Sequence, residues 1–323
     1  MVDQTFASPW HRGEVALQRR MGVADRMAET GKRVIRTELI EQHRAFYRLL
    51  PMVVLGAADP AGDVWATIRA GHPGFLTSPD TRTLRVDLPR EASDPADAGM
   101  EDGDALGLLG IDLRTRRRNR LNGHVLRNSD AGFQLSVEQS FGNCPKYIQL
   151  RGMELVGDPL QPYAGGIEEM SRLDTAAKSL VSCTDTFFVA SYIDGDGGKR
   201  QVDVSHRGGR PGFVHVEADS TLIIPDFTGN RFYNTLGNIA LNPRAGLVFV
   251  EGGQLLQMTG TAEIIAMSEM PDFEGAELFW RFRPTRIVRR EAALPLSLEA
   301  EADGSSPNSL ATGSWREARN LRW

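Results

Sequence analysis

The chain has 323 residues, of which 41% are hydrophobic and 24% charged, and its formal net charge is −5 at neutral pH. This length favours two domains or one two-lobed body, and the composition excludes disordered and fibrous proteins. With a pI near 5.8, the chain has no overall positive field that would attract nucleic acid. No stretch approaches the roughly 20 apolar residues of a membrane-spanning helix, and residues 1–20 lack a signal-peptide core, so we expect a cytoplasmic protein without membrane contact.

The first half predicts short strands separated by turns. A helical stretch around 39–50 precedes a strand over 52–58, a turn at 59–62 and a second strand that runs into Pro73-Gly74-Phe75. The acidic, Pro- and Gly-containing stretch 89–104 is typical of a surface insertion.

The second half repeats this order. A helix is predicted over 167–181, followed by strands over 187–193 and 201–207 and then by Pro211-Gly212-Phe213. The two Pro-Gly-Phe triplets begin at 73 and 211, a separation of 138 positions, and Leu84 and Leu222 keep the same separation. The pattern therefore predicts two antiparallel β units of about 100 residues each, with Gly/Pro/Asp turns typical of small barrels.

We accordingly expect a mainly β protein with short helices. Its segments are predicted as an N-terminal helical extension (1–30), a first β unit (31–151), a linker (152–166), a second β unit (167–290) and a C-terminal tail (291–323). Within the tail, 299–313 is either disordered or draped over the body.

Ser205 and Arg207 form the first candidate site. Alternation along a strand places them on one face and His206 on the other, and a hydroxyl beside a guanidinium suits a phosphate group, with Gly208 allowing close backbone approach. Thr67 and Arg69 stand in the same relation in the first half. A solvated edge strand is the alternative interpretation.

An asparagine-rich segment, 226–238, is the second candidate. If it opens a helix that Asn242-Pro243 ends, Asn230, Asn234 and Asn238 share a face that can donate and accept toward a heteroaromatic ring. Capping and turn roles are the alternative, and they account better for Asn230 than for the other two.

Two further segments carry positive charge. Lys146 and Tyr147 follow Pro145 and could meet a phosphate and a ring, whereas Cys144 beside them has no base that the sequence places next to it. In the run 114–120, Arg116, Arg118 and Arg120 would share a strand face and hold an anionic ligand or acidic segment. A solvated strand paired with the acidic stretch is the alternative. No metal-ligand spacing is present.

Taken together, these segments resemble the pyridoxamine 5'-phosphate oxidase-like flavin-nucleotide-binding proteins. The residues that carry the resemblance are Ser205-His206-Arg207-Gly208-Gly209 with the following Pro-Gly-Phe, the segments 229–238 and 242–246, and Phe-Gly-Asn-Cys-Pro-Lys-Tyr-Ile at 141–148. The resemblance covers about 10–290 and implies two tandem split β-barrels of the FMN-binding type, packed as an intrachain pseudo-dimer.

The resemblance also implies a function and a site. It implies non-covalent FMN and a flavin-dependent oxidoreductase that uses a small-molecule substrate and an external electron donor or reductase, with a homodimer as a further expectation. A binding protein without turnover, for a deazaflavin, haem or flavin, is the alternative. The implied FMN-binding residues are Ser205, His206, Arg207, Gly208, Asn230, Asn234, Thr235, Asn238, Lys146 and Tyr147, with Thr67 and Arg69 as a second or degenerate site.

Overall fold

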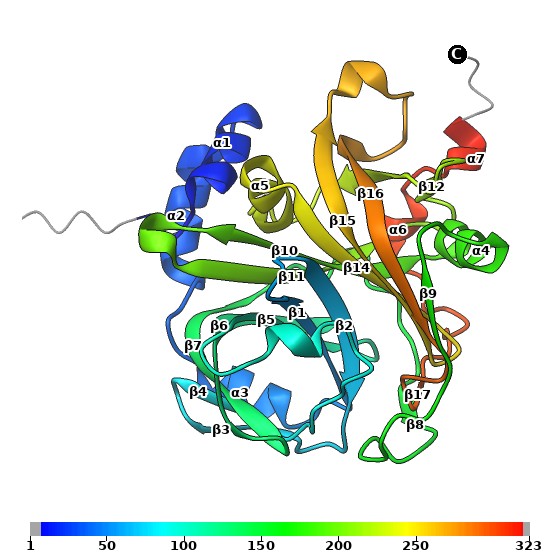
Figure 1. The fold of residues 1–323 in the computed structure, drawn as a ribbon. Helices are drawn as coiled ribbons and strands as arrows, with labels where there is room; N and C mark the ends of the chain where they lie inside the picture. The colour runs from blue at the N-terminus through cyan, green and yellow to red at the C-terminus, as the bar shows by residue number, and fades with distance from the viewer. Residues whose placement is uncertain (1–7, 319–323) are drawn as a thin grey trace, which may run out of the picture.

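The computed structural model describes residues 8–318 and confirms a mainly β chain with antiparallel sheets (Figure 1). The first sheet contains β1 (Met52–Ala58), β2 (Val64–Ala70), β3 (Leu76–Asp80), β4 (Thr83–Val86), β5 (Ala105–Asp112), β6 (Arg117–Ser129) and β7 (Gly132–Gly142). The second contains β9 (Ile167–Met170), β10 (Thr186–Asp194), β11 (Arg200–Gly208), β12 (His215–Val216), β13 (Leu222–Phe227), β14 (Arg244–Glu251), β15 (Gln254–Ile265) and β16 (Ala276–Arg290). A small sheet pairs β8 (Glu154–Leu155) with β17 (Leu296–Ser297).

Helices are short and lie around the sheets. They are α1 (Arg12–Arg20), α2 (Ala24–Val34), α3 (Glu41–Tyr47), α4 (Thr175–Cys183), α5 (Asn234–Leu241), α6 (Pro307–Leu310) and α7 (Trp315–Ala318). Single 3-10 turns occur at Asp97–Gly99, Asp196–Gly198 and Met267–Glu269. Across residues 8–318, none of the helices combines the length and the apolar character that crossing a membrane requires.

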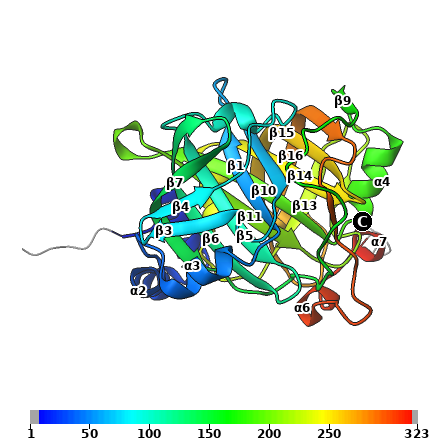
Figure 2. The same cartoon turned by 90° about the horizontal axis from the view of Figure 1, so that it is seen from below.

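The two large sheets have the same strand order. The first runs β2-β1-β5-β6-β7-β4-β3, and the second runs β11-β10-β14-β15-β16-β13-β12, with β9 added at β16. Each strand of the first half therefore has a counterpart at the same place in the second. In Figures 1 and 2 the halves pack so that β1 and β2 lie against β10 and β14.

Strand alternation explains how the halves hold together. Along β1, Val53 and Leu55 point into the core of the first half, whereas Met52 and Val54 point into a separate apolar cluster between the sheets. Strand β10 contributes to that cluster through Phe188, Ala190 and Tyr192. Both faces of these central strands are buried along nearly their whole length, so the interface between the sheets is itself a hydrophobic core.

Two glycines allow the sheets to approach closely. A Cβ at Gly107 on β5 would lie 2.8 Å from the carbonyl oxygen of Val202, and a Cβ at Gly246 on β14 would lie 2.2 Å from that of Val64. The two glycines occupy corresponding strands of the two halves. Each thus makes room for the backbone of the other half.

The single helix predicted over 167–181 is wrong. Residues Ile167–Met170 form β9, which pairs with β16, and the helix α4 begins only at Thr175. The Asp174 side chain accepts a hydrogen bond from the Ala177 amide at 2.7 Å and caps α4, so the helical apolar spacing is realised only in its later part.

The predicted surface insertion 89–104 is also wrong. Asp94, Ala96 and Met100 are buried there, and a Cβ at Gly99 would collide with the backbone of Ala58 on β1. Of the two alternatives for 299–313, the draped one holds, because Ser306 and Ser309 are buried against the body.

Candidate functional site

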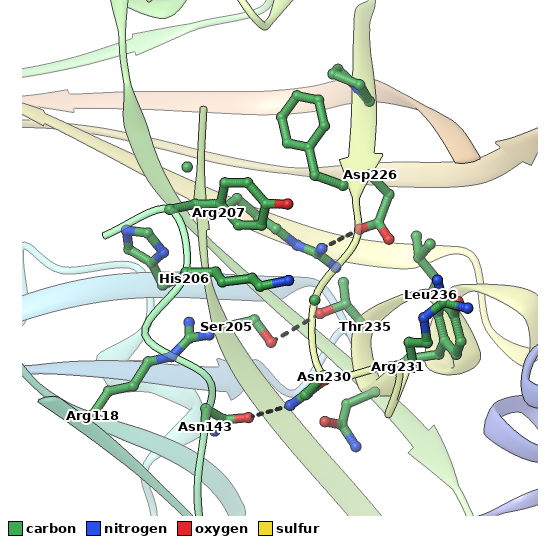
Figure 3. A pocket seen from close by; sticks show the side chains of 18 of the residues that line it. Arg118, Asn143, Ser205, His206, Arg207, Asp226, Asn230, Arg231, Thr235 and Leu236 are labelled. Atoms are coloured by element: carbon green, nitrogen blue, oxygen red, sulfur yellow. Dashed lines mark hydrogen bonds and ion pairs between the residues drawn. The ribbon is translucent and has the colours of Figure 1, made fainter. Parts of the chain in front are cut away.

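A cleft opens where the two halves meet, and both halves supply its walls (Figure 3). The first half contributes Arg118 and Arg120 from β6 and residues 143–147 after β7. The second contributes β11 around Ser205 and the connection from β13 to α5. Its volume is about 100 Å³.

Arginines dominate one side of the cleft. Arg120 bridges the halves, since it donates to Asp203 Oδ1 at 3.0 Å and to the Ser205 hydroxyl. Arg207 is paired with the buried Asp226. Arg118 donates to the carbonyl oxygen of Cys144 and has no carboxylate partner within residues 8–318. The cleft therefore holds more positive than negative charge close to Arg118.

Burial and neighbouring cations together lower the pKa values of two groups in the cleft. Burial, with Arg120 as the next contribution, lowers the pKa of Arg118 to about 9. Burial also holds the pKa of His206 well below its usual value, again with Arg118 as a neighbour, and His206 Nε2 is buried without a hydrogen-bond partner in the described chain. An anion in the cleft would offset the repulsion between Arg118 and its cationic neighbours.

Ser205 lies at the centre of the arrangement. Its oxygen accepts hydrogen bonds from Arg120 and from Thr235 Oγ1, the latter at 3.0 Å. The hydroxyl proton of Ser205 is therefore available to a ligand. Thr235 is placed there because α5 begins at Asn234, one residue before it.

The cleft walls contain strained backbone. Of the six non-glycine residues with positive φ in the described chain, Tyr147 (65°), Arg231 (63°) and Tyr233 (62°) line this one cleft. Such conformations cost free energy and persist where surrounding structure imposes them, commonly at binding sites.

A buried polar network lies behind the cleft. Glu14 of α1 accepts a hydrogen bond from Asn234 Nδ2 and one from the backbone amide of His11. Burial, followed by the nearby Asp203, raises the pKa of Glu14 to about 8. The N-terminal helix thus brings a carboxylic acid to the residue that starts α5.

Most residues predicted from the sequence come together here. Arg207, Gly208 and Asn230 line the cleft with Ser205, His206, Asn234, Thr235, Lys146 and Tyr147.

The predicted shared face of three asparagines is wrong. Tyr233, with its positive φ, precedes α5, so Asn230 lies outside the helix and donates instead to Asn143 Oδ1 at 2.9 Å. Asn238 is fully buried and donates to Asp203 Oδ2 at 2.9 Å and to Ser191 Oγ at 3.1 Å, away from the cleft.

Thr67 and Arg69 do not reach the cleft either. They lie on β2, where Thr67 donates to Asp94 and Arg69 donates to the carbonyl oxygen of Pro89. Both partners belong to the stretch 89–104, which occupies the space in front of β2.

The arginine run supplies cleft residues that are absent from the FMN-binding set implied by the resemblance. Arg118 and Arg120 point into the cleft, whereas Arg116 lies in the preceding turn with positive φ and bonds the carbonyl oxygens of Ile148 and Gly304. The predicted face of three arginines is therefore wrong for Arg116. A solvated strand is wrong for Arg120, which is 4% exposed. The signal in the sequence was the charge run itself, but the partners of Arg120, Asp203 and Ser205, lie in the other half.

Comparisons with known proteins find only partial similarity. No family model and no curated protein matches the chain. Among solved structures, HupZ of Group A Streptococcus is similar at 19% identity over 36% of this chain and 98% of that chain, with a TM-score of 0.27. An FAD-binding protein of Mesorhizobium loti is similar at 14% identity over 38% and 97%, with a TM-score of 0.25. A Clostridium acetobutylicum protein of the pyridoxinephosphate oxidase family, related to general stress protein 26, is similar at 15% identity over 38% and 89%, also with a TM-score of 0.25. At these scores the likenesses carry no weight for fold or function, which rest on the strand order and the cleft.

Proposed function

We propose that the chain is built as two tandem split barrels and binds FMN in the cleft between them, with the phosphate at the arginines. The observation that carries the proposal is Arg118, a cleft guanidinium with no carboxylate partner in the described chain, beside Arg120 and Arg207. A phosphate would supply the missing negative charge and accept several charge-assisted hydrogen bonds.

The size of the cavity limits what lies inside it. Ligand-sized pockets usually measure roughly 300–1,000 Å³, and this one measures about 100 Å³. A pocket of this volume suits the phosphate end of the nucleotide better than the whole molecule. We assign the ring system to the remainder of the cleft, whose lining includes the aromatic side chains of Tyr147, Phe227 and Tyr233.

The proposed activity is that of a flavin-dependent oxidoreductase. Bound FMN would supply hydride or electron transfer, and the residues of the chain would bind and orient it. A small-molecule substrate and an external electron donor belong to this proposal. Purified protein should be yellow and should bleach on reduction by a nicotinamide donor; a flavin that binds but that nicotinamide donors never reduce would favour a carrier.

Paired titrations with FMN and riboflavin test the binding site. Arg118→Gln should weaken FMN binding by about 10-fold or more, the usual worth of a hydrogen bond to a charged group. Riboflavin, which lacks the phosphate, should bind both proteins alike. Arg114→Gln is the matched control, because Arg114 lies in the same run but pairs with Asp112 at 2.9 Å outside the cleft. Equal losses for both ligands, or none for FMN, would refute the assignment.

A further inference from the structure

The first half contains a counterpart of the cleft. On β2, Thr67 pairs with Leu55 of the neighbouring central strand, and on β11 Ser205 pairs with Val189 of the corresponding strand. Thr67 and Ser205 therefore occupy equivalent positions in the two sheets.

The facing residues are equivalent as well. Arg120 pairs with Leu109 on β5, and Gln257 pairs with Val248 on β14, which are corresponding strands. Arg120 reaches across to Ser205, and Gln257 likewise reaches across to the first half, where it donates to the carbonyl oxygen of Ala66 at 3.1 Å.

The counterpart is filled by a carboxylate of the chain itself. Asp94 is buried and accepts three hydrogen bonds, from Thr67 Oγ1 at 2.5 Å, Gln257 Nε2 at 3.0 Å and the Ala96 amide at 3.1 Å. It also forms an ion pair with Arg290, whose nearest nitrogen lies 3.3 Å away. This donor set, a hydroxyl, an amide and a guanidinium, is one that would hold a free anion.

The buried guanidinium of Arg290 depends on Asp94 for its compensating negative charge. Its side chain is 2% exposed, its Nε has no hydrogen-bond partner in the described chain, and its other acidic neighbour, Glu91, is 3.8 Å away. Ser93 Oγ accepts a hydrogen bond from it at 2.9 Å. Without Asp94, a buried guanidinium would lose its closest carboxylate.

We propose that Thr67, Gln257 and Arg290 form a second anion site, specific for a carboxylate group, that Asp94 keeps permanently occupied. A small external carboxylate enters this site once the Asp94 side chain is removed. Because Asp94 occupies this second site, we expect one nucleotide per chain, and this consequence rests on the proposed function. The existence of the second site does not rest on it.

Chemical rescue of Asp94→Ala tests the proposal. The variant should melt about 5–10 °C below the wild type, because an unpaired buried charge is strongly destabilising. Sodium formate or acetate should recover part of this loss in a saturable way, and sodium chloride at the same ionic strength should not. Asp97→Ala is the matched control, since Asp97 lies in the same turn and is buried but pairs with Arg90 instead, at 3.4 Å.

Asp94→Asn provides the second measurement. It keeps the side-chain volume, so it should be destabilised without recovery by formate. If Asp94→Ala does not fold alone, refolding in formate should restore it. The proposal is overturned if Asp94→Ala melts like the wild type, or if formate stabilises it no more than it stabilises Asp97→Ala. Neither outcome depends on whether FMN binds.

Discussion

Arg120 of the first half donates to both Ser205 and Asp203 of the second, across the boundary between the sheets. Arg120 and Asp203 are 4% and 6% exposed. One guanidinium therefore links the interface of the halves to the centre of the candidate site.

Replacing Arg120 should destabilise the whole chain. Arg120→Gln leaves Asp203 as a buried charge without its cationic partner, so we expect a loss of about 3–5 kcal/mol in the free energy of unfolding. Urea unfolding measures it. Arg117→Gln, at an exposed position of the same strand, should change stability by less than about 1 kcal/mol. A similar small loss for Arg120→Gln would show that the bridge is dispensable.

Arg207→Ala should weaken FMN binding by about 1.5–3 kcal/mol, or roughly 10- to 150-fold in Kd. Arg207 lines the cleft, and its pairing with Asp226 leaves part of the guanidinium, including Nε, without a partner in the described chain. Fluorescence titration gives Kd, with Arg210→Ala, whose partner is Glu317 on the C-terminal helix, as control. An unchanged Kd would exclude Arg207 from the site.

Gly246→Ala should separate the sheets locally and cost about 1–3 kcal/mol, the usual range for overpacking. The added carbon would fall 2.2 Å from a backbone oxygen of the other half, which cannot rotate away. Gly142→Ala is the control, because nothing lies within 4 Å of its Cβ position. Thermal unfolding of both variants compares them, and equal Tm values would contradict the close approach of the sheets.

Glu14 should make the stability of the folded chain depend on pH. Its pKa is raised from 4.5 to about 8 in the folded state, so between these values the folded chain binds more protons than the unfolded one. Stability then falls as pH rises through this window, by up to about 1.4 kcal/mol per pH unit. His11, whose pKa is lowered by burial, acts in the opposite direction as it loses its proton.

Comparison of Glu14→Gln with the wild type isolates the Glu14 contribution. The variant keeps a hydrogen-bonding side chain but cannot ionise, so its unfolding free energy should decline less from pH 5 to pH 8. Urea unfolding at several pH values measures the difference. Parallel curves for the two proteins would mean that Glu14 is ionised in the folded chain.

Much of the fold follows from local sequence rules. Alternation and Gly/Pro turns predict the strand over 52–58 and the neighbouring positions of Ser205 and Arg207, since residues two apart on a strand share a face. The recurring Pro-Gly-Phe triplets predict that the two halves share an order, and they do.

What the sequence does not predict depends on contacts between distant segments. Arg120 and Ser205 are 85 positions apart and meet only because the sheets dock. The start of α5 depends on the left-handed conformation of Tyr233, which no residue preference indicates. The sequence of the acidic stretch 89–104 suggests a solvated segment, because nothing local reveals that Asp94 forms a buried ion pair with the distant Arg290.

Joining both halves in one polypeptide frees them to differ. In a symmetric homodimer every substitution appears twice, so a side chain that blocked one of two equivalent pockets would block the other as well. Here Asp94 fills the pocket at Thr67 while the pocket at Ser205 stays open. Covalent fusion thus lets one position serve stability while the equivalent position is free for the ligand that we propose.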